Sequence, residues 1–342
     1  MANLTFDCDE VLAKHPGALP PLQDGLKQFV WILLALLPLL TLIGNGVVIL
    51  SVARFRYLRT KANAFVVSLA VADICVALLI VPFRAVELGN DHIWPLGETF
   101  CDIVNVFDCV FSTASILNLS CLACDRYLAI SRPFLHVKIR HKTTVVMILS
   151  CWIIPILAFV VPIMWHWNLS GVEHLSYCFT KVEKGCPLLM NKPYSVFSTL
   201  VSFYVPTIFM AVCYSRIFAA ARRHARNLQT LAHRDAEFKD EGRLQQETKA
   251  AKTLGIVMGC FCVCWFPFIL INTADPFLDF TLPNLAKLIA MWLGYLNSTM
   301  NPILFYVFSR QFKMAYKQLF MCCKIRRDMF TGLARSSQQT VI

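Results

Sequence analysis

Seven long apolar runs limit most strongly what this chain can fold into. The hydrocarbon core of a bilayer is about 30 Å thick, and roughly 20 consecutive apolar residues in a helix cross it. Hydrophobic residues make up 57% of the sequence, charged residues 15%, and the mean hydropathy is +0.58, which excludes an ordinary soluble chain. The sequence therefore predicts an all-α integral membrane protein, a seven-transmembrane helix bundle. The runs lie near 28–54, 62–86, 98–131, 143–167, 193–222, 248–273 and 283–308.

The positive charges are placed at the ends of these runs. The formal net charge is +11, but the Lys and Arg residues cluster at these ends, as expected of loops that face an anionic cytoplasmic leaflet. The positive charge therefore does not indicate a nucleic-acid role. The loops after the second and sixth runs contain neither Lys nor Arg. We therefore expect a multi-pass plasma-membrane protein with its N-terminus extracellular and its C-terminus cytoplasmic. The basic residues after the first and third runs are Arg54, Arg56, Arg59, Lys61, Arg132, Lys138, Arg140 and Lys142.

The remaining segments are short. We expect an extracellular segment at 1–27 without a cleavable signal peptide, a membrane domain at 28–308, and an amphipathic interfacial helix with a cytoplasmic tail at 309–342. The polar segment 223–246 is short enough to be helical extensions of its two neighbours, so no second domain is expected.

Four positions outside the runs suggest covalent modification. Asn3 and Asn168 begin glycosylation sequons in segments that the predicted orientation places outside the cell. Cys322 and Cys323 directly follow the expected interfacial helix. They would be either palmitoylated or free cytosolic thiols.

Two carboxylates lie inside apolar runs, where an unpaired charge costs several kcal/mol. Asp73 is in the middle of the second run and Asp108 in the outer half of the third. Each could be a protonated packing carboxyl instead of a functional group. Asp108 lies seven residues after Cys101, roughly 10 Å along one helix face, and Cys101 could pair with Cys178 or Cys186. Such a bridge would fold a loop over a carboxylate suited to an alkylammonium ligand.

Aromatic and hydroxyl side chains occur at a similar depth. Aromatic rings in the sixth and seventh runs could surround a cation, although such a stripe is often plain helix packing. Ser198 and Ser202 share one face of the fifth run with Thr199 beside them, and they could bind the polar end of an aromatic ligand. The alternative for these hydroxyls is a hydrogen bond to a carbonyl one turn earlier. The aromatic residues are Trp265, Phe266, Phe268 and Tyr295.

Three short motifs occur in the right order in the third, sixth and seventh runs: CDRY at 124–127, CWFP at 264–267 and NPILF at 301–305. With seven spans and Trp152, Pro206 and Asp73 in the fourth, fifth and second runs, the chain resembles a rhodopsin-like (class A) G-protein-coupled receptor over essentially its whole length.

Within that family the sequence resembles aminergic receptors. The segments 190–206, 247–268 and 274–283 are similar to trace-amine-associated receptors and to the type-4 serotonin receptor. The segment 221–229 and a Cys8/Cys178 pair favour a divergent trace-amine type, whereas 297–312 lacks that group's Tyr-x-Trp-Phe ending. The resemblance implies a ligand site of Asp108, Cys109, Ser112, Ser198, Thr199, Ser202, Trp265, Phe268, Ile269, Asn272 and Tyr295, with Asp108 binding the ammonium.

The same resemblance implies further roles. Cys101 would pair with Cys186, and no cofactor is expected beyond a sodium ion as an allosteric ligand. The sodium site would be Asp73, Ser115, Asn297, Ser298 and Asn301. The activation switch would comprise Asp125, Arg126, Tyr127, Pro206, Ile116, Phe261, Tyr214, Glu247, Pro302 and Phe305, with an Arg126–Glu247 ion pair holding the resting state. Phe305 replaces the family's tyrosine, and Tyr306 is its neighbour.

The implied function is activation of a heterotrimeric G protein, of the cAMP-raising Gs or olfactory Golf class, by a biogenic or trace amine, which could be a monoamine, diamine or polyamine. The alternative is a serotonin receptor of type-4 character. Glu87 and Asp275, with Asp279 nearby, could hold a second ammonium or be solvated loop charges. An opsin is excluded because Tyr295 stands where the retinal-binding lysine would be. We find no inverted repeats of the kind that would indicate a transporter, and no sequence motif of an enzyme, so neither class is supported.

Overall fold

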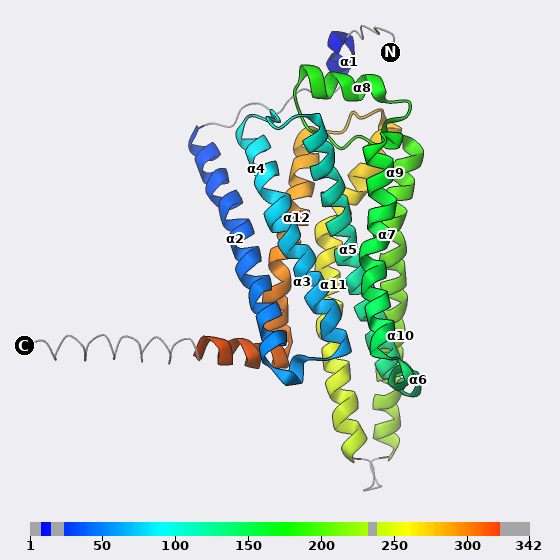
Figure 1. Cartoon of the computed structure of the whole chain (residues 1–342). Coiled ribbons are helices and arrows are strands. Elements are labelled where there is room, and N and C mark those ends of the chain that lie inside the picture. Colours follow the sequence, from blue (N-terminus) through cyan, green and yellow to red (C-terminus); the bar gives the residue numbers. More distant parts are fainter. Residues whose placement is uncertain (1–7, 15–23, 232–237, 322–342) are drawn as a thin grey trace, which may run out of the picture.

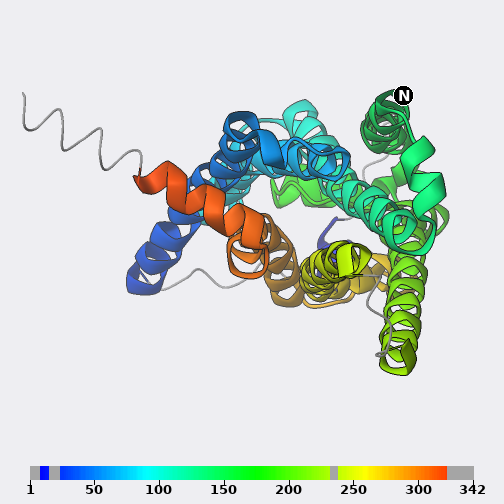
Figure 2. The same ribbon diagram turned by 90° about the horizontal axis from the view of Figure 1, so that it is seen from below.

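The structure is a computed structural model that describes residues 8–14, 24–231 and 238–321. Within these ranges it describes the side chains of all residues except 24–31, 33, 221, 223–231 and 238–254. Seven long helical segments pack side by side (Figures 1 and 2), and they confirm the predicted bundle. They are α2 (Asp24–Arg54), α3 (Lys61–Leu79) with α4 (Val81–Gly89), α5 (Glu98–Ser131), α7 (His141–Met164), α9 (Lys192–Thr199) with the π-helical turn η4 (Leu200–Tyr204) and α10 (Val205–Leu231), α11 (Phe238–Ala274), and α12 (Asn284–Phe308).

Within the described residues, six of these segments are apolar and long enough to cross a membrane by composition alone, and α12 is the exception. The reason is its polar stretch, since Asn297, Ser298, Thr299 and Asn301 lower its average hydropathy. All four side chains are buried, so they face the bundle and not the lipid. Because α12 packs against α2, α3 and α11, it completes the bundle as the seventh span.

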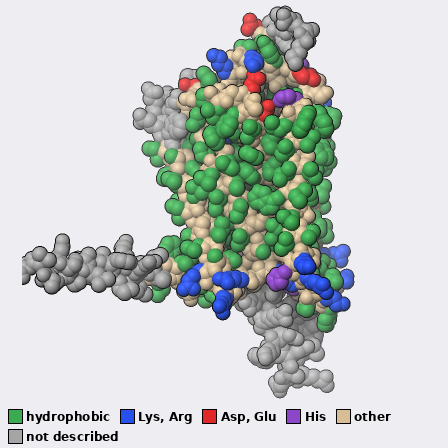
Figure 3. Space-filling view, in the orientation of Figure 1, with side chains coloured by type: hydrophobic (Ala, Val, Ile, Leu, Met, Phe, Trp, Pro, Cys, Tyr) green, Lys and Arg blue, Asp and Glu red, His purple; other side chains and the backbone are tan. Residues whose placement is uncertain are grey.

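The bundle surface is an apolar belt with unlike ends (Figure 3). Large apolar side chains such as Leu157 and Val263 are 65% and 70% exposed, as expected where lipid is the solvent. Lys and Arg gather at the end that carries helix 310–321, which we call the basic end. The opposite end carries both disulfides, and we call it the disulfide end.

Two prolines explain where the spans change geometry. Pro82 lies at the start of α4, where the N–H that proline lacks would have no helical partner. It separates α4 from α3 at Ile80. Pro206 follows the π-helical turn η4. Proline cannot donate a regular helical hydrogen bond, and the wider turn before it accommodates this missing bond. This local widening sets which fifth-span side chains face the bundle interior.

Two disulfides order the loop 165–191 over the disulfide end. Cys101 at the start of α5 bonds Cys186, and Cys8 of α1 (Cys8–Lys14) bonds Cys178 in the short π-helix η3 (Cys178–Val182). Both predicted pairings are confirmed. This loop also contains the 3-10 turn η2 (Trp167–Leu169) and α8 (Glu173–Tyr177).

The predicted glycosylation of Asn168 is wrong for this fold. Asn168 is only 4% exposed, and its amide nitrogen donates a hydrogen bond to the Leu189 carbonyl oxygen at 2.8 Å. A glycan needs that nitrogen at the surface. Asn3, Cys322 and Cys323 lie outside the described residues, so their predicted modifications are untested.

The helix at 310–321 turns away from the bundle axis (Figure 1), as expected of an interfacial helix. Phe312 and Tyr316 are buried against the bundle, while Lys313 and Lys317 are exposed. Its apolar side therefore anchors it below α12. The backbone of α10 continues to Leu231 and that of α11 begins at Phe238, in agreement with the predicted helical extensions.

Replacing Gly44 with alanine should destabilise the packing of α2 against α12. A Cβ at Gly44 would lie 2.8 Å from Cγ of Pro302, and the proline ring cannot move aside. Overpacking of this kind typically lowers the free energy of unfolding by about 1–3 kcal/mol. Thermal unfolding of the detergent-solubilised protein measures the effect. Gly46→Ala is the matched control, because nothing lies within 4 Å of its Cβ; equal melting temperatures for the two variants would contradict the prediction.

Candidate functional site

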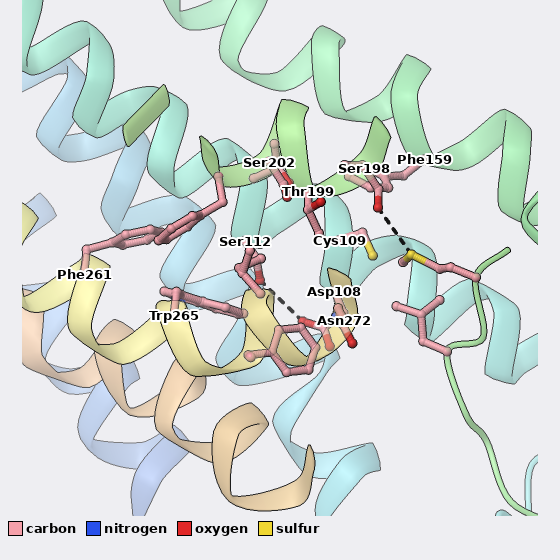
Figure 4. A pocket seen from close by; sticks show the side chains of 16 residues that line it. Asp108, Cys109, Ser112, Phe159, Ser198, Thr199, Ser202, Phe261, Trp265 and Asn272 are labelled. Carbon is pink, nitrogen blue, oxygen red and sulfur yellow. Dashed lines mark hydrogen bonds between the residues drawn. The ribbon is translucent and has the colours of Figure 1, made fainter. Parts of the chain in front are cut away.

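A cavity of about 550 Å³, counting the space at its mouth, opens among α5, α9, η4 and α11 below the disulfide end. Figure 4 shows side chains from these elements pointing into it. The structure brings together at its wall ten of the eleven ligand-site residues that the sequence predicted. They are Asp108, Cys109, Ser112, Ser198, Thr199, Ser202, Trp265, Phe268, Ile269 and Asn272.

The remaining wall was not foreseen from the sequence. Leu188 and Met190 come from the loop that follows Cys186, and Phe159 comes from α7. These residues are ordinary apolar side chains, so only the loop's path over the bundle identifies them. Thr113, Phe203 and Phe261 complete the lining.

Asp108 is held in place by two hydroxyl donors. The Tyr295 hydroxyl donates to Asp108 Oδ2 at 2.5 Å, and Ser112 Oγ, one helical turn along α5, donates to Oδ1 at 3.4 Å (Figure 4 shows the latter). Tyr295 is 1% exposed and does not line the cavity. Its ring therefore does not close around a ligand as the sequence suggested, and its role in this structure is to orient the carboxylate.

The aromatic residues of α11 divide between the cavity and the lipid-facing surface. Trp265 and Phe268 meet edge to face with their ring centroids 5.8 Å apart, and Phe261 stacks on Trp265 at 6.2 Å. Phe266 is 49% exposed and points out of the bundle, so its predicted place near the ligand is wrong. The cavity floor is thus a cluster of three rings, a surface suited to aromatic or cationic groups.

Two of the three fifth-span hydroxyls of the predicted ligand site already form hydrogen bonds to the backbone. Ser198 donates to the Ser195 carbonyl at 3.0 Å and lies 3.3 Å from Met190 Sδ, while Thr199 donates to the Ser195 carbonyl at 2.7 Å. The backbone-bonding alternative therefore holds for these two. Among the described residues Ser202 has no protein partner, so it is the hydroxyl most available to a bound molecule.

The carboxylates considered for a second ammonium already pair with protein cations. Glu87 Oε2 accepts from Arg84 Nη1 at 2.9 Å, and Asp275 lies 2.6 Å from Lys287 Nζ. Asp279 lies 3.9 Å from Lys192. The predicted second site at Glu87 and Asp275 is therefore not supported, because neither carboxylate is unpaired.

A second, wider cavity of about 1260 Å³, counting its open mouth, lies between the start of α5 and the loop 165–191. Its wall includes Asp102 and the ion pair of Glu98 with Lys181 at 2.5 Å, and this contact raises the pKa of the Lys181 amine. Leu188 lines both cavities, so the wider one adjoins the smaller. Only the smaller contains the intramembrane carboxylate.

Asp73 lies in a buried polar group in the middle of the bundle. Asn301 Nδ2 donates to Asp73 Oδ2 at 2.8 Å, and Ser298 is within hydrogen-bonding reach of the same carboxylate. Ser115 and Asn297, the other predicted sodium ligands, are also buried. Asp73 Oδ1, Asn297 Oδ1 and Asn301 Oδ1 accept no hydrogen bond from the described residues. Buried oxygens without donors fit a hard cation.

The CDRY motif lies at the basic end of α5. Arg126 Nη2 donates to Asp125 Oδ2 at 2.6 Å, and His136 of α6 (Pro133–Lys138) lies 3.0 Å from Asp125 Oδ1. Tyr127 is half-buried beside them. The Glu247 side chain is outside the described residues, so its ion pair with Arg126 stays a prediction. Ile116, Phe261 and Trp265 belong to one apolar core of the bundle, and Pro206 is also buried.

The departure from the NPxxY pattern has a clear structural form. Phe305 is 2% exposed and stacks on Phe312 at 5.3 Å, whereas Tyr306 is 38% exposed and stacks on Tyr316 at 5.8 Å. The Tyr306 hydroxyl therefore lies on the outer face, away from the core position that Phe305 holds. The family resemblance implies that a tyrosine at position 305 would direct its hydroxyl towards Tyr214, and Tyr214 is itself buried.

On the expectation that the family resemblance gives, replacing Phe305 with tyrosine should change basal signalling. The new hydroxyl would enter an apolar contact with Phe312 and would need a polar partner, which Tyr214 would offer only if the basic end rearranged. Basal and ligand-stimulated second-messenger levels, normalised to surface expression, measure the change. Tyr306→Phe is the control, since its ring is partly exposed. The idea fails if Phe305→Tyr leaves both signals at the wild-type level.

A helix bundle that keeps an intramembrane carboxylate at a cavity between its spans has the architecture of a ligand-binding membrane receptor. The chain belongs to the 7 transmembrane receptor (rhodopsin family), whose family model matches residues 44–305. Members of this family are multi-pass membrane receptors and not enzymes.

Several receptors named for amines are similar to this chain. The 5-hydroxytryptamine receptor 4 of Cavia porcellus is 39% identical over 326 residues, covering 89% of this chain and 83% of the relative. The octopamine receptor beta-2R of Chilo suppressalis is 36% identical over 84% of this chain and 78% of the relative. The trace amine-associated receptor 1 of Macaca mulatta is 35% identical over 86% and 88%. The aminergic resemblance is therefore confirmed.

Proposed function

We propose that this receptor binds a biogenic or trace amine, with the ligand ammonium on Asp108, and activates a heterotrimeric G protein of the Gs or Golf class. The observation that carries the proposal is the Asp108 carboxylate, fixed by Tyr295 and Ser112 at the wall of an otherwise largely apolar cavity. An ammonium placed there would make a charge-assisted hydrogen bond in a region of low dielectric. The cluster of Trp265, Phe268 and Phe261 would receive the ligand's ring.

The proposed orientation places the disulfide end outside the cell. Two disulfides need an oxidising compartment, and the basic end has the Lys and Arg content of cytoplasmic loops. Arg126 then faces the cytoplasm, where a G protein binds. Asp73 and the buried oxygens of Asn297 and Asn301 would hold a sodium ion that favours the resting state.

A serotonin receptor of type-4 character is the second candidate, because the Cavia porcellus relative named for 5-hydroxytryptamine covers 89% of the chain. Ser202 favours a ligand with a phenolic or indole hydroxyl in either case. Serotonin and tyramine differ in ring size, so the same assay ranks the two candidates.

The test is second-messenger signalling in cells that express the wild-type chain. Phenethylamine, tyramine, dopamine, octopamine, serotonin and histamine are compared with N-acetylphenethylamine, which keeps the ring and loses the charge. We expect at least one amine to raise cAMP and the amide to be inactive. An inositol phosphate response without cAMP would overturn the Gs/Golf assignment, and activation by the amide would overturn recognition through an ammonium.

A further inference from the structure

Arg84 is an arginine inside a membrane-spanning helix, and it is only 6% exposed. Its Nη1 donates to Glu87 Oε2 at 2.9 Å and to the Cys186 carbonyl oxygen at 3.0 Å, and its Nη2 donates to Asn105 Oδ1. Glu87 Oε1 in turn accepts the Cys186 backbone N–H at 3.0 Å. We call Arg84, Glu87, Asn105 and Cys186 the Arg84 network. It joins α4, α5 and the loop that covers the cavity.

This network adjoins the proposed ammonium site. Asn105 lies three residues before Asp108 on α5, less than one helical turn away. The Arg84 guanidinium interacts electrostatically with Asp108 and also with Tyr295, whose hydroxyl donates to Asp108. A fixed positive charge therefore lies beside the carboxylate in a buried region where solvent screens little.

The charges of this region balance in a way that bears on the ligand. An arginine stays protonated at all relevant pH values, so Arg84 contributes one positive charge. Glu87 compensates it, and both Glu87 oxygens are occupied, one by Arg84 and one by the Cys186 amide. Asp108 remains as a negative charge to which no cation among the described residues donates a hydrogen bond. One ammonium, and not two, completes the balance.

We infer that Arg84 is a specificity-determining residue that makes this site selective for ligands with a single ammonium and rejects diamines and polyamines. The inference rests on the proposed function. Arg84 lines neither cavity, but its guanidinium, which three acceptors hold in place, would repel a second ammonium on the α4 side of Asp108. Among the described residues of the Arg84 network, no unpaired carboxylate would compensate that second charge. Like charges that lie close together repel strongly where the dielectric is low.

The test uses two ligands of equal size in binding and cAMP assays. 2-(4-Ethylphenyl)ethylamine carries one ammonium, and 2-[4-(aminomethyl)phenyl]ethylamine carries two on the same frame. Wild type should bind the monoamine at least about tenfold more tightly, or ~1.4 kcal/mol. Arg84→Gln keeps a polar side chain, removes the charge and frees Glu87, so the preference should vanish or reverse. In Arg84→Gln/Glu87→Gln the monoamine preference should return.

Two control variants separate charge from folding. Arg84→Lys keeps the charge and should keep the monoamine preference. Lys192→Gln breaks an exposed ion pair with Asp279, at 55% and 88% side-chain exposure, and should not change the preference. Surface staining reports expression of every variant.

The outcomes distinguish this inference from the proposed function. Equal affinity of wild type for both ligands overturns the role of Arg84 without any variant. An unchanged monoamine preference in surface-expressed Arg84→Gln overturns it as well. If wild type binds neither ligand nor any amine of the wider panel, the proposed function fails and the inference fails with it; if Asp108→Asn abolishes monoamine binding, the proposed function stands whichever way Arg84 behaves.

Discussion

Replacing Asp108 with asparagine should remove amine activation almost completely. The variant keeps the size of the side chain and an oxygen that can accept the Tyr295 hydroxyl, so the carboxylate's negative charge is the main loss. Truncating one partner of a buried, hydrogen-bonded charge pair costs roughly 2–5 kcal/mol, which corresponds to about 30-fold to several thousand-fold in affinity. Concentration–response curves for cAMP and competition binding on the same membranes measure both potency and affinity.

Two matched variants show whether the effect is specific to that carboxylate. Asp102→Asn removes a charge from the same helix but at the wall of the wider cavity, and amine potency should change by less than about threefold. Tyr295→Phe removes one hydroxyl donor to Asp108 and should lower amine potency at least about tenfold, because a single hydrogen bond to a charged group is worth roughly 1.5–3 kcal/mol. Unaltered potency in surface-expressed Asp108→Asn would show that the ammonium binds elsewhere.

The sequence predicted the cavity well because helical periodicity and family motifs act at short range. Asp108, Cys109 and Ser112 are fixed by the register of α5, and Trp265, Phe268 and Ile269 by that of α11. Once each helix is placed, the residues on its inner face follow. The prediction that Phe266 lies near the ligand was wrong because neighbouring aromatic and apolar residues on one helix cannot all face the bundle interior. These residues are Trp265, Phe266, Phe268 and Ile269.

Contacts between distant segments were harder to foresee. Glu87 and Asp275 seemed available for a ligand because their partners are set by tertiary packing: Arg84 is near in sequence, but its burial depends on Cys186, which lies 102 residues further along the chain. Asn168 matched a sequon, yet its amide supports the loop through Leu189. One signal was present: an arginine within an apolar run carries the same cost that singled out Asp73 and Asp108.

The loop therefore contributes more to the site than a cover. Cys186 supplies its backbone N–H to Glu87 and its carbonyl oxygen to Arg84, and two and four residues later Leu188 and Met190 form part of the cavity wall. The Asn105 amide lies 3.5 Å from Cys101 Sγ and 3.9 Å from Cys186 Sγ. The Cys101–Cys186 bridge thus keeps the loop residues of the cavity wall in place. It also keeps the backbone partners of Arg84 and Glu87 in place beside Asp108.

Removing the Cys101–Cys186 bridge should consequently abolish ligand binding at the cell surface. In Cys101→Ser/Cys186→Ser the loop loses its covalent tie to α5, so Arg84 and Glu87 each lose a backbone partner and the cavity loses Leu188 and Met190. Loss of a native disulfide typically costs about 2–5 kcal/mol, and we expect amine affinity to fall by more than about 100-fold in whatever protein reaches the surface. Surface staining and saturation binding measure the two effects separately.

The second bridge provides the internal comparison. Cys8–Cys178 ties the seven-residue helix α1 to the outer part of the same loop, and neither cysteine lines the cavity. A pure chain-entropy account would rank this bridge at least as high, since it closes 170 residues against 85. The contacts around Cys186 reverse that order: Cys8→Ser/Cys178→Ser should keep amine affinity within about threefold of wild type, because the Arg84 network stays intact. Comparable losses of affinity in the two double variants would mean that closure of the whole loop, and not the local contacts of Cys186, maintains the site.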